Sequence, residues 1–304
     1  MTDYYIDGVT GDDADDGNIV TPWKTITKAN NTLVAGDTVW IRGGVYNGQA
    51  ISPVASGTAG NMIKYNAYPG EVPILMNVNT GFTITNKNYI RVDGIDQDGE
   101  FERPNNNIQQ WAELDNSDYC EIENCNLQFC HDSGIDLTNG SHHTKILNNI
   151  LKSCGINDIT SNTSQAAGDS LRIRPGCDFT LVEGNFLSHV GHNLLHTGAA
   201  YCVIRKNIFD SLRDDGSGYR NGILDDKENG DYLTAFNIFE QNEFRNAGTT
   251  PYGKAGPGLT IHGLNNIIRF NFFIKGDEDG LNCTARDKVG NNENCMIYHN
   301  VFSD

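Results

Sequence analysis

The stretch "HDSGIDL" at 131–137 carries residue types that can do chemistry. It places Asp132 and Asp136 four residues apart around a small, glycine-containing core, with Asp136 flanked by Ile135 and Leu137. Carboxylates are preferred ligands of hard cations such as Ca²⁺, and a carboxylate on a strand can also pair with a cation on the next strand. The stretch therefore predicts either a calcium site with Asp132 and Asp136 as ligands or a strand with one outward carboxylate.

Basic and imidazole side chains follow in two later apolar segments. Arg172 and Arg174 alternate with apolar residues in "SLRIR", and His196 ends "NLLH". A guanidinium clamps a carboxylate through two parallel hydrogen bonds but is a poor base, whereas histidine is the commonest general base near neutral pH. Arg172, Arg174 and His196 are therefore candidate catalytic residues. His196 as an ordinary outward strand residue and Arg172 as a structural partner of Asp136 are the alternatives.

Three further segments add candidates. "GILDDKENG" supplies Asp225 as a substrate contact, Asp226 as a third metal ligand and Lys227 as another possible base, unless the three form an ordinary charged turn. His262 in "GLTIH" and Arg286 in "TARDK" are candidate substrate-binding residues. These segments are far apart in sequence, so a site needs a fold that stacks them.

An internal repeat supplies that fold. An apolar residue, two variable residues, Asn and one or two apolar residues recur, with weaker copies at 92 and 122 and clear ones from 146 onward. The copies begin at residues 92, 122, 146, 182, 204, 239, 268 and 297, so the steps are 22 to 36 residues. Short strand-like segments bounded by Gly, Asn and Asp turns precede the later copies. This pattern predicts a solenoid, and because a leucine-rich-repeat pattern is absent we expect a right-handed parallel β-helix. The repeated Asn is then expected at a left-handed turn position, its amides forming a ladder.

Alignment of the coils predicts which side chains face outward. Counting back eleven residues from each copy places two columns inward: Ile135, Leu171 and Asn193, and Leu137, Ile173 and Leu195. The outward columns are then Asp136, Arg172 and Leu194, and Thr138, Arg174 and His196. Neighbouring strands lie ~4.8 Å apart, so we expect a polar patch across three coils.

The ends of the chain differ in their patterns. Residues 21–33 predict a helix with Thr21 as N-cap, which covers the first coil. We expect one domain over 1–304, with a cap region at 1–50 and coils at 51–304. The sequence stops in mid-coil without a second cap, which predicts a covering partner, such as a second copy of the chain, or further coils.

Two other features have structural interpretations. Cys120, Cys202 and Cys295 each precede a repeat by two residues, which predicts reduced thiols packed in the core, with disulfides as the alternative. "GDDADDGN" at 11–18 resembles a calcium loop but lacks the alternating acidic register and distal Glu. It is therefore interpreted as a solvated turn.

Composition excludes several function classes. The 304 residues carry a formal charge of −17, which disfavours nonspecific binding to nucleic acid or anionic membranes. No apolar run reaches the ~18 residues of a membrane span, and the first residues lack a signal-peptide pattern. We expect a secreted or virion-associated protein, with a cytoplasmic location as the alternative.

The N-terminal segments "YYIDGVTGDDADDGN", "TPWKTITKAN" and "VAGDTVWIRGGVYNG", followed by "SGTAGNMIKYNAYPGEVPIL", resemble right-handed β-helix proteins of the pectate-lyase-like superfamily. The resemblance extends over nearly the whole chain. Within it, "HDSGIDL" resembles the calcium-binding "DDGxDL" stretch of family-nine polysaccharide lyases, with Ser133 replacing one acidic ligand. "SLRIRPG" lies where those enzymes carry a catalytic lysine, a position that Arg172 holds here.

The resemblance and the residues together predict a polysaccharide lyase that cleaves an acidic, uronate-containing glycan by β-elimination with the help of Ca²⁺. A glycoside hydrolase using paired carboxylates is the first alternative, with the pairs Asp225 and Asp226 or Asp277 and Asp279. A noncatalytic carbohydrate-binding or tailspike-type β-helix is the second. A polysaccharide is the expected partner in all three cases.

Overall fold

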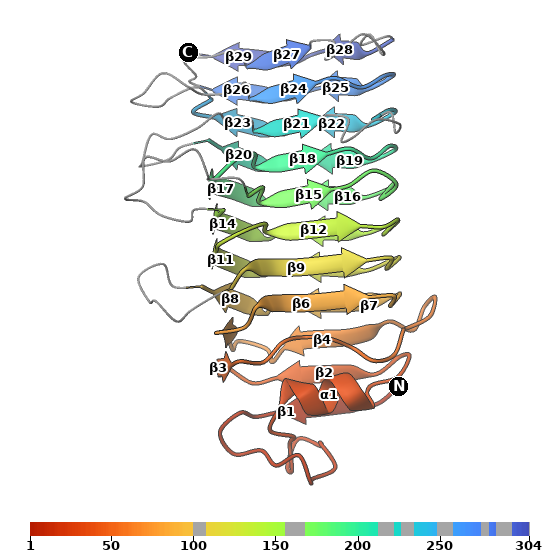
Figure 1. The fold of residues 1–304 in the computed structure, drawn as a ribbon, viewed down its shortest axis with the longest axis vertical. Coiled ribbons are helices and arrows are strands. Elements are labelled where there is room, and N and C mark those ends of the chain that lie inside the picture. Colours follow the sequence, from red (N-terminus) through yellow and green to blue (C-terminus); the bar gives the residue numbers. More distant parts are fainter. Residues whose placement is uncertain are drawn as a thin grey trace.

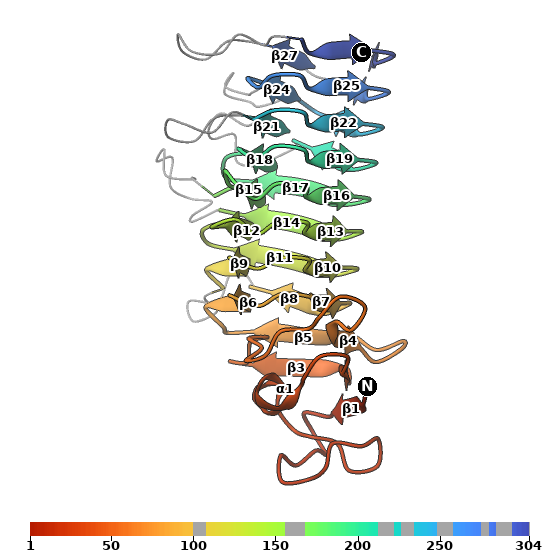
Figure 2. The ribbon, with the colours of Figure 1, turned by 90° about the vertical axis from the view of Figure 1, so that its right-hand side faces the viewer.

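The computed structural model describes residues 1–99, 108–155, 168–211, 222–225, 234–247, 258–274, 280–283 and 294–303. The chain is all-β with one short helix in these ranges, and its strands stack as coils of a right-handed parallel β-helix (Figure 1). This confirms the fold predicted from the repeat. Three parallel sheets run along the solenoid axis, as the second view also shows (Figure 2).

Sheet A has eleven strands, and in its central coils the residue in the middle of each strand points into the core. Ile122, Ile146 and Val182 are such residues, and all three are fully buried. The strands in sheet order are β1 (Asp3–Ile6), β2 (Thr38–Ile41), β4 (Ile63–Ala67), β7 (Ile90–Asp93), β10 (Glu121–Glu123), β13 (Lys145–Leu147), β16 (Leu181–Glu183), β19 (Val203–Arg205), β22 (Ile238–Glu240), β25 (Ile267–Arg269) and β28 (Met296–Tyr298).

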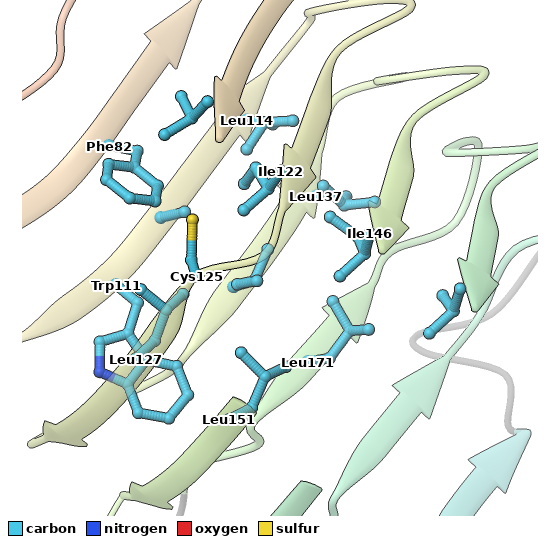
Figure 3. Close-up of a cluster of buried hydrophobic side chains, with 14 of the residues drawn as sticks. Phe82, Trp111, Leu114, Ile122, Cys125, Leu127, Leu137, Ile146, Leu151 and Leu171 are labelled. Carbon is cyan, nitrogen blue, oxygen red and sulfur yellow. The ribbon is translucent and has the colours of Figure 1, made fainter. Parts of the chain in front are cut away.

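Sheet B follows sheet A after a short turn in each coil. Its inward column includes Leu127, Leu151 and Leu187, all fully buried. Leu127 and Leu151 lie in the core with inward residues of the other sheets, such as Ile122 and Leu171 (Figure 3). Its ten strands are β29 (Val301–Ser303), β26 (Phe272–Ile274), β23 (Glu243–Arg245), β20 (Ile208–Asp210), β17 (Phe186–Val190), β14 (Ile150–Cys154), β11 (Asn126–Cys130), β8 (Asp96–Asp98), β5 (Pro73–Met76) and β3 (Gly44–Asn47).

Sheet C has eight strands and carries the outward polar residues of interest. In β12 the neighbours of Asp136, Ile135 and Leu137, are fully buried, as the period-two pattern predicts. Its strands are β27 (Leu281–Cys283), β24 (Leu259–Ile261), β21 (Ile223–Asp225), β18 (Leu195–Thr197), β15 (Leu171–Ile173), β12 (Ile135–Thr138), β9 (Gln110–Asp115) and β6 (Thr80–Thr85).

A ladder of buried asparagines joins the coils at the turn between sheets A and B. Asn185 donates from Nδ2 to Oδ1 of Asn207 at 3.0 Å, and Asn207 donates likewise to Asn242 at 3.0 Å. The predicted amide ladder is therefore confirmed. The left-handed residue, however, is the one before each ladder Asn, such as Lys206 with φ 56°, so the backbone explanation was wrong. The ladder Asn is selected for its side-chain amide.

The N-terminal helix is shorter than predicted. Helix α1 (Ile26–Thr32) has Thr25 as N-cap, whose hydroxyl accepts from Lys28 N, so Thr21 as N-cap was wrong. The physical reason is Asp13, whose carboxylate accepts from both the amide and the hydroxyl of Thr25 and fixes the helix start there. The predicted apolar face is buried, with Trp23 nearly covered.

Aspartate side chains of the acidic N-terminal segment accept hydrogen bonds from nearby backbone amides. Asp7 accepts from the amides of Val9 and Thr10, and Asp13 from that of Lys24. These are turn-capping contacts, in agreement with the interpretation of "GDDADDGN" as a turn.

The cysteines are free thiols. Cys120 and Cys202 are fully buried, and Cys295 packs against the core, as predicted. In the last coil, the apolar residues Ile297 and Phe302 are 47% and 58% exposed. That a second copy of the chain covers them stays a prediction.

Candidate functional site

The outward column of sheet C gathers the candidate catalytic residues. Asp136 lies in register with Glu113 on one side and Arg172 on the other, and Arg172 lies in register with His196. The prediction placed His196 one column away, beside Arg174, and Asn193 in the core column. That alignment was wrong for the third coil, because Leu195 rather than Asn193 pairs with Leu171.

The cause of this shift is a turn of different length. Ile135 and Leu171 each precede the inward residue of the next sheet A strand by eleven residues, whereas Leu195 precedes Ile204 by nine. The turn from sheet C to sheet A is thus two residues shorter in that coil. His196 is thereby brought directly beside Arg172.

Asp136 pairs with Arg174 rather than with Arg172. Nε of Arg174 donates to Oδ1 of Asp136 at 3.0 Å, and Nη2 donates to Oδ2 at 2.9 Å. Asp136 is only 5% exposed. The predicted pairing of Asp136 with Arg172 was therefore wrong, and the cross-coil cation is Arg174, which directly follows β15.

Asp169, which was not among the predicted site residues, contacts Arg172 and two histidines of the site. Its Oδ2 accepts from Nε of Arg172 at 3.1 Å and lies 3.4 Å from Nδ1 of His196. Its Oδ1 lies 3.0 Å from Nδ1 of His192 and accepts from the amide of Asn193 at 2.9 Å. The Asp169 side chain is 1% exposed. One buried carboxylate therefore orients groups from two coils.

A close backbone approach positions Asp169. A Cβ on Gly168 would lie 1.6 Å from the carbonyl oxygen of Asp132, so only glycine fits where the chain enters this coil. Gly134 donates from its amide to the carbonyl of Asp169. The only sequence signal for Asp169 was an acidic residue three positions before Arg172.

The electrostatics keep Asp169 ionised. Burial alone would raise its pKa, but the hydrogen bonds from His192 and His196 and their charges outweigh burial. The pKa of Asp169 is consequently held well below the usual range. A permanent buried anion then favours the tautomer of His196 with its proton on Nδ1.

His196 has one nitrogen left for chemistry. The residue is 8% exposed, and its Nε2 is buried with no hydrogen-bond partner among the described residues. Because a carboxylate can only accept, Nδ1 next to Asp169 carries a hydrogen, and in the neutral imidazole Nε2 then carries the lone pair. An oriented, unpaired imidazole nitrogen is what a general base requires.

The predicted calcium ligands do not fit a cation site. Both oxygens of Asp136 are bound by Arg174, Asp132 is exposed, and Ser133 is buried beside it. Among the described residues, no group of three or more His, Cys, Asp or Glu side chains is arranged to hold a metal ion. Calcium needs six to eight oxygen ligands, so we derive no step through it, and Asp226 lies outside the described residues.

The remaining candidates are only partly placed. His262 directly follows β24 and is half-buried. Asp225 lies at the end of β21, in register with Thr197, and its side chain is not described. Outside the described residues lie three further candidates and one carboxylate pair: Asp226, Lys227, Arg286, and Asp277 with Asp279.

The comparison with protein families decides the family. The model of the Pel9A-like right-handed β-helix region matches residues 4–186, more than half of the chain. The chain belongs to the Pel9A-like family. The match covers β12 and β15 with Asp136, Asp169 and Arg172, and it ends before His196. No curated protein matches the chain.

Solved structures agree with the Pel9A-like fold. The structure of pectate lyase Pel9A is 17% identical, with a TM-score of 0.61 over 95% of this chain and 79% of that one. A rhamnogalacturonan lyase is 16% identical, with a TM-score of 0.57 over 90% and 74%. At these identities the likeness shows the fold alone.

A glycoside hydrolase shares the fold as well. The native lacto-N-biosidase from Eubacterium ramulus is 13% identical, with a TM-score of 0.58 over 99% of this chain and 68% of that one. This chain spans 63% of the selenomethionine form of the same enzyme. The Pel9A-like fold thus carries both lyase and hydrolase chemistry, and the site itself must distinguish them.

Proposed function

We propose that the chain is a polysaccharide lyase that cleaves an acidic glycan by β-elimination on the outer face of sheet C. The observation that carries the proposal is the buried, unpaired Nε2 of His196, whose ring is oriented through Nδ1 by the ionised Asp169. Elimination needs a base at the carbon next to a carboxylate and a cation that neutralises that carboxylate.

Arg172 is suited to the second task. Only its Nε is used by Asp169, and its side chain is 17% exposed. Its two terminal nitrogens can therefore donate to a uronate carboxylate, in the bidentate geometry that guanidinium favours. Withdrawing charge from the carboxylate makes the neighbouring C–H more acidic.

His196 is the base of the proposed elimination. Nε2 of His196 takes the proton from the carbon next to the carboxylate, and the electron pair of that C–H bond forms a C=C bond. The glycosidic C–O bond breaks, and its oxygen leaves with a proton from water or from the imidazolium of His196. The product carries an unsaturated sugar at its new non-reducing end.

Names of relatives support the substrate class. The family is named after a pectate lyase, and a rhamnogalacturonan lyase shares the fold. Arg172 and Arg174 lie on one outward face of a chain with a net charge of −17, and the terminal nitrogens of Arg172, which Asp169 does not use, can bind an anionic sugar. A polysaccharide is therefore proposed as the partner. No described helix is long and apolar enough to cross a membrane.

A hydrolase is less well supported by this site. Glu113 and Asp136 lie in register on neighbouring strands, which are ~4.8 Å apart, so the two form the carboxylate pair to consider for a retaining hydrolase. Both Asp136 oxygens, however, are bound to Arg174, so this carboxylate is not free to attack a sugar. The predicted pairs at 225–226 and 277–279 stay predictions.

The proposal is tested by screening polygalacturonate, alginate and glycosaminoglycans for the ultraviolet absorbance of the unsaturated product. We expect one of them to be cleaved by the parent protein, and His196→Ala to lower kcat by about 10² to 10⁴-fold, the usual contribution of a general base. Lys152→Gln, on a sheet B strand, is the matched control and should keep full activity. No absorbance with any polyuronate would overturn the proposal.

A further inference from the structure

A cavity of 320 Å³ lies on the outer face of sheet A, separate from the candidate site on sheet C. We call it the Tyr89 pocket, and the residues that matter are Met62, Lys64, Tyr89, Tyr119, Glu121 and Lys145. They belong to the early and middle coils, on β4, β10 and β13 and in the turns before sheet A strands (Figure 1). Nothing in the proposed reaction uses them.

The hollow arises from the side chain of Arg91. Arg91 lies in register between Lys64 and Glu121 on the outward column of sheet A. Its guanidinium, however, reaches along the sheet to Asp93 at 2.9 Å and to Glu123. The space that a long side chain would fill is therefore left open between the column and the adjoining turns.

One wall of the pocket is aromatic. Tyr89 and Tyr119 stack with ring centroids 4.8 Å apart and an interplanar angle of 2°, and the stack continues from Tyr119 to His143 on the next coil. Tyr89 stacks on no other ring among the described residues. In the preceding coil Met62 occupies the equivalent turn position, because Ile63 pairs with Ile90. Met62 and the half-buried ring of Tyr89 both line the pocket and together form its apolar wall, against which the C–H face of a sugar can pack.

Two lysines lie at opposite ends of the pocket. Lys64 has no carboxylate partner among the described residues, while Lys145 donates to Glu121 at 2.6 Å. Lys64 on β4 and Lys145 on β13 are three strand spacings apart, which is ~14 Å. This length suits a short run of sugars rather than a single one. An unpaired lysine is notable in a chain with 39 acidic and 22 basic residues.

We propose that the Tyr89 pocket is a noncatalytic binding site for an acidic sugar segment of the polysaccharide. One pyranose ring packs its C–H face on Tyr89, its carboxylate binds Lys64, and Glu121 accepts from sugar hydroxyls. The acidic nature of the glycan rests on the proposed function. A second site on another face holds a long chain near the protein and so raises its effective concentration at sheet C.

The test uses His196→Ala as the parent, so that bound polymer is not consumed. Migration of this protein is measured in native gels that contain polygalacturonate, alginate or a glycosaminoglycan, with dextran as the neutral polymer. We expect retardation by one acidic polymer, and about tenfold weaker binding on adding Lys64→Gln or Tyr89→Ala, equivalent to ~1.4 kcal/mol. Lys152→Gln is the matched control and should bind like the parent.

The outcomes separate this inference from the proposed function. Unchanged binding in the Lys64→Gln variant, equal retardation by dextran, or no retardation by any acidic polymer would each overturn the Tyr89 pocket as a glycan site. If Tyr89→Ala unfolds, Lys64→Gln alone decides. Weaker binding in Lys64→Gln, together with no cleavage by the wild type, would support the pocket and overturn the lyase proposal. Cleavage by the wild type, together with unchanged binding in Lys64→Gln, would support the lyase and overturn the pocket.

Discussion

Asp169→Asn is the substitution that tests the candidate site most sharply, because it keeps the size of the side chain and removes its charge. The carboxylate contacts Arg172, His192 and His196 through its two oxygens. An amide has one acceptor oxygen and an NH₂ group that can only donate. At least one of these three contacts must therefore be lost, and a donor then faces a donor.

The magnitudes follow from these contacts. Hydrogen bonds to a charged group contribute about 1.5–3 kcal/mol each, so losing one or two of them predicts ~1.5–6 kcal/mol less stability. The rate should fall more than the stability. Without the anion, Nδ1 of His196 is no longer held as the protonated nitrogen, and we expect kcat to fall by about 10² to 10⁴-fold, the range of general-base catalysis.

The assay is cleavage of the glycan identified by screening, followed under conditions where urea unfolding shows the variant to be folded. Asp118→Asn is the matched control, because the donor to the Asp118 carboxylate among the described residues is the backbone amide of His142, which an amide oxygen can also accept. Activity within twofold of wild type in Asp169→Asn would refute the role of Asp169 as the orienting anion. Equal losses of activity in Asp169→Asn and Asp118→Asn would refute a role that is specific to Asp169.

Further predictions address the neighbouring groups. Arg172→Lys should lower kcat/KM by about tenfold or more, since lysine keeps the charge but loses the bidentate geometry, with steady-state kinetics as the measurement. Chelation of divalent cations should leave activity unchanged because Arg174 already binds Asp136, and loss of activity that calcium restores would contradict this. Asn207→Ala removes four ladder hydrogen bonds, so urea unfolding should show ~2–4 kcal/mol less stability. The pKa of Asp169 is lowered on folding. Its contribution to the free energy of unfolding is therefore present above the unfolded pKa of ~3.9 and is lost as the pH falls below that value. Below pH ~3.9, the stability of Asp169→Asn should consequently depend less on pH than that of the wild type.

The repeat in the sequence was sufficient to predict the fold. Period-two apolar positions and a recurring Asn predict parallel strands and a stacked turn, and residues such as Ile146 and Asn185 occupy the expected places. The inward and outward faces of β12 and β15 follow from the same alternation. Such features depend on local pattern, which one sequence records well.

The pairing within the site could not be predicted in the same way. His196 was displaced because the turn after β18 is two residues shorter, and turn length is invisible until the strands are paired. Asp136 was assigned to Arg172 by register, but the long side chain of Arg174 reaches it from a different position. Asp169 lies just before β15, outside the strand pattern that selected the other candidates.

The central claim is that the site breaks the glycosidic bond by elimination, and cleavage in water enriched with heavy oxygen tests it most directly. A lyase forms both product ends without adding water, so mass spectrometry should find no heavy oxygen introduced at the cleaved bond and one unsaturated end per cut. A hydrolase adds the oxygen of water to the new reducing end. Heavy oxygen introduced by cleavage, with saturated products, would contradict the role of His196 as the base of an elimination.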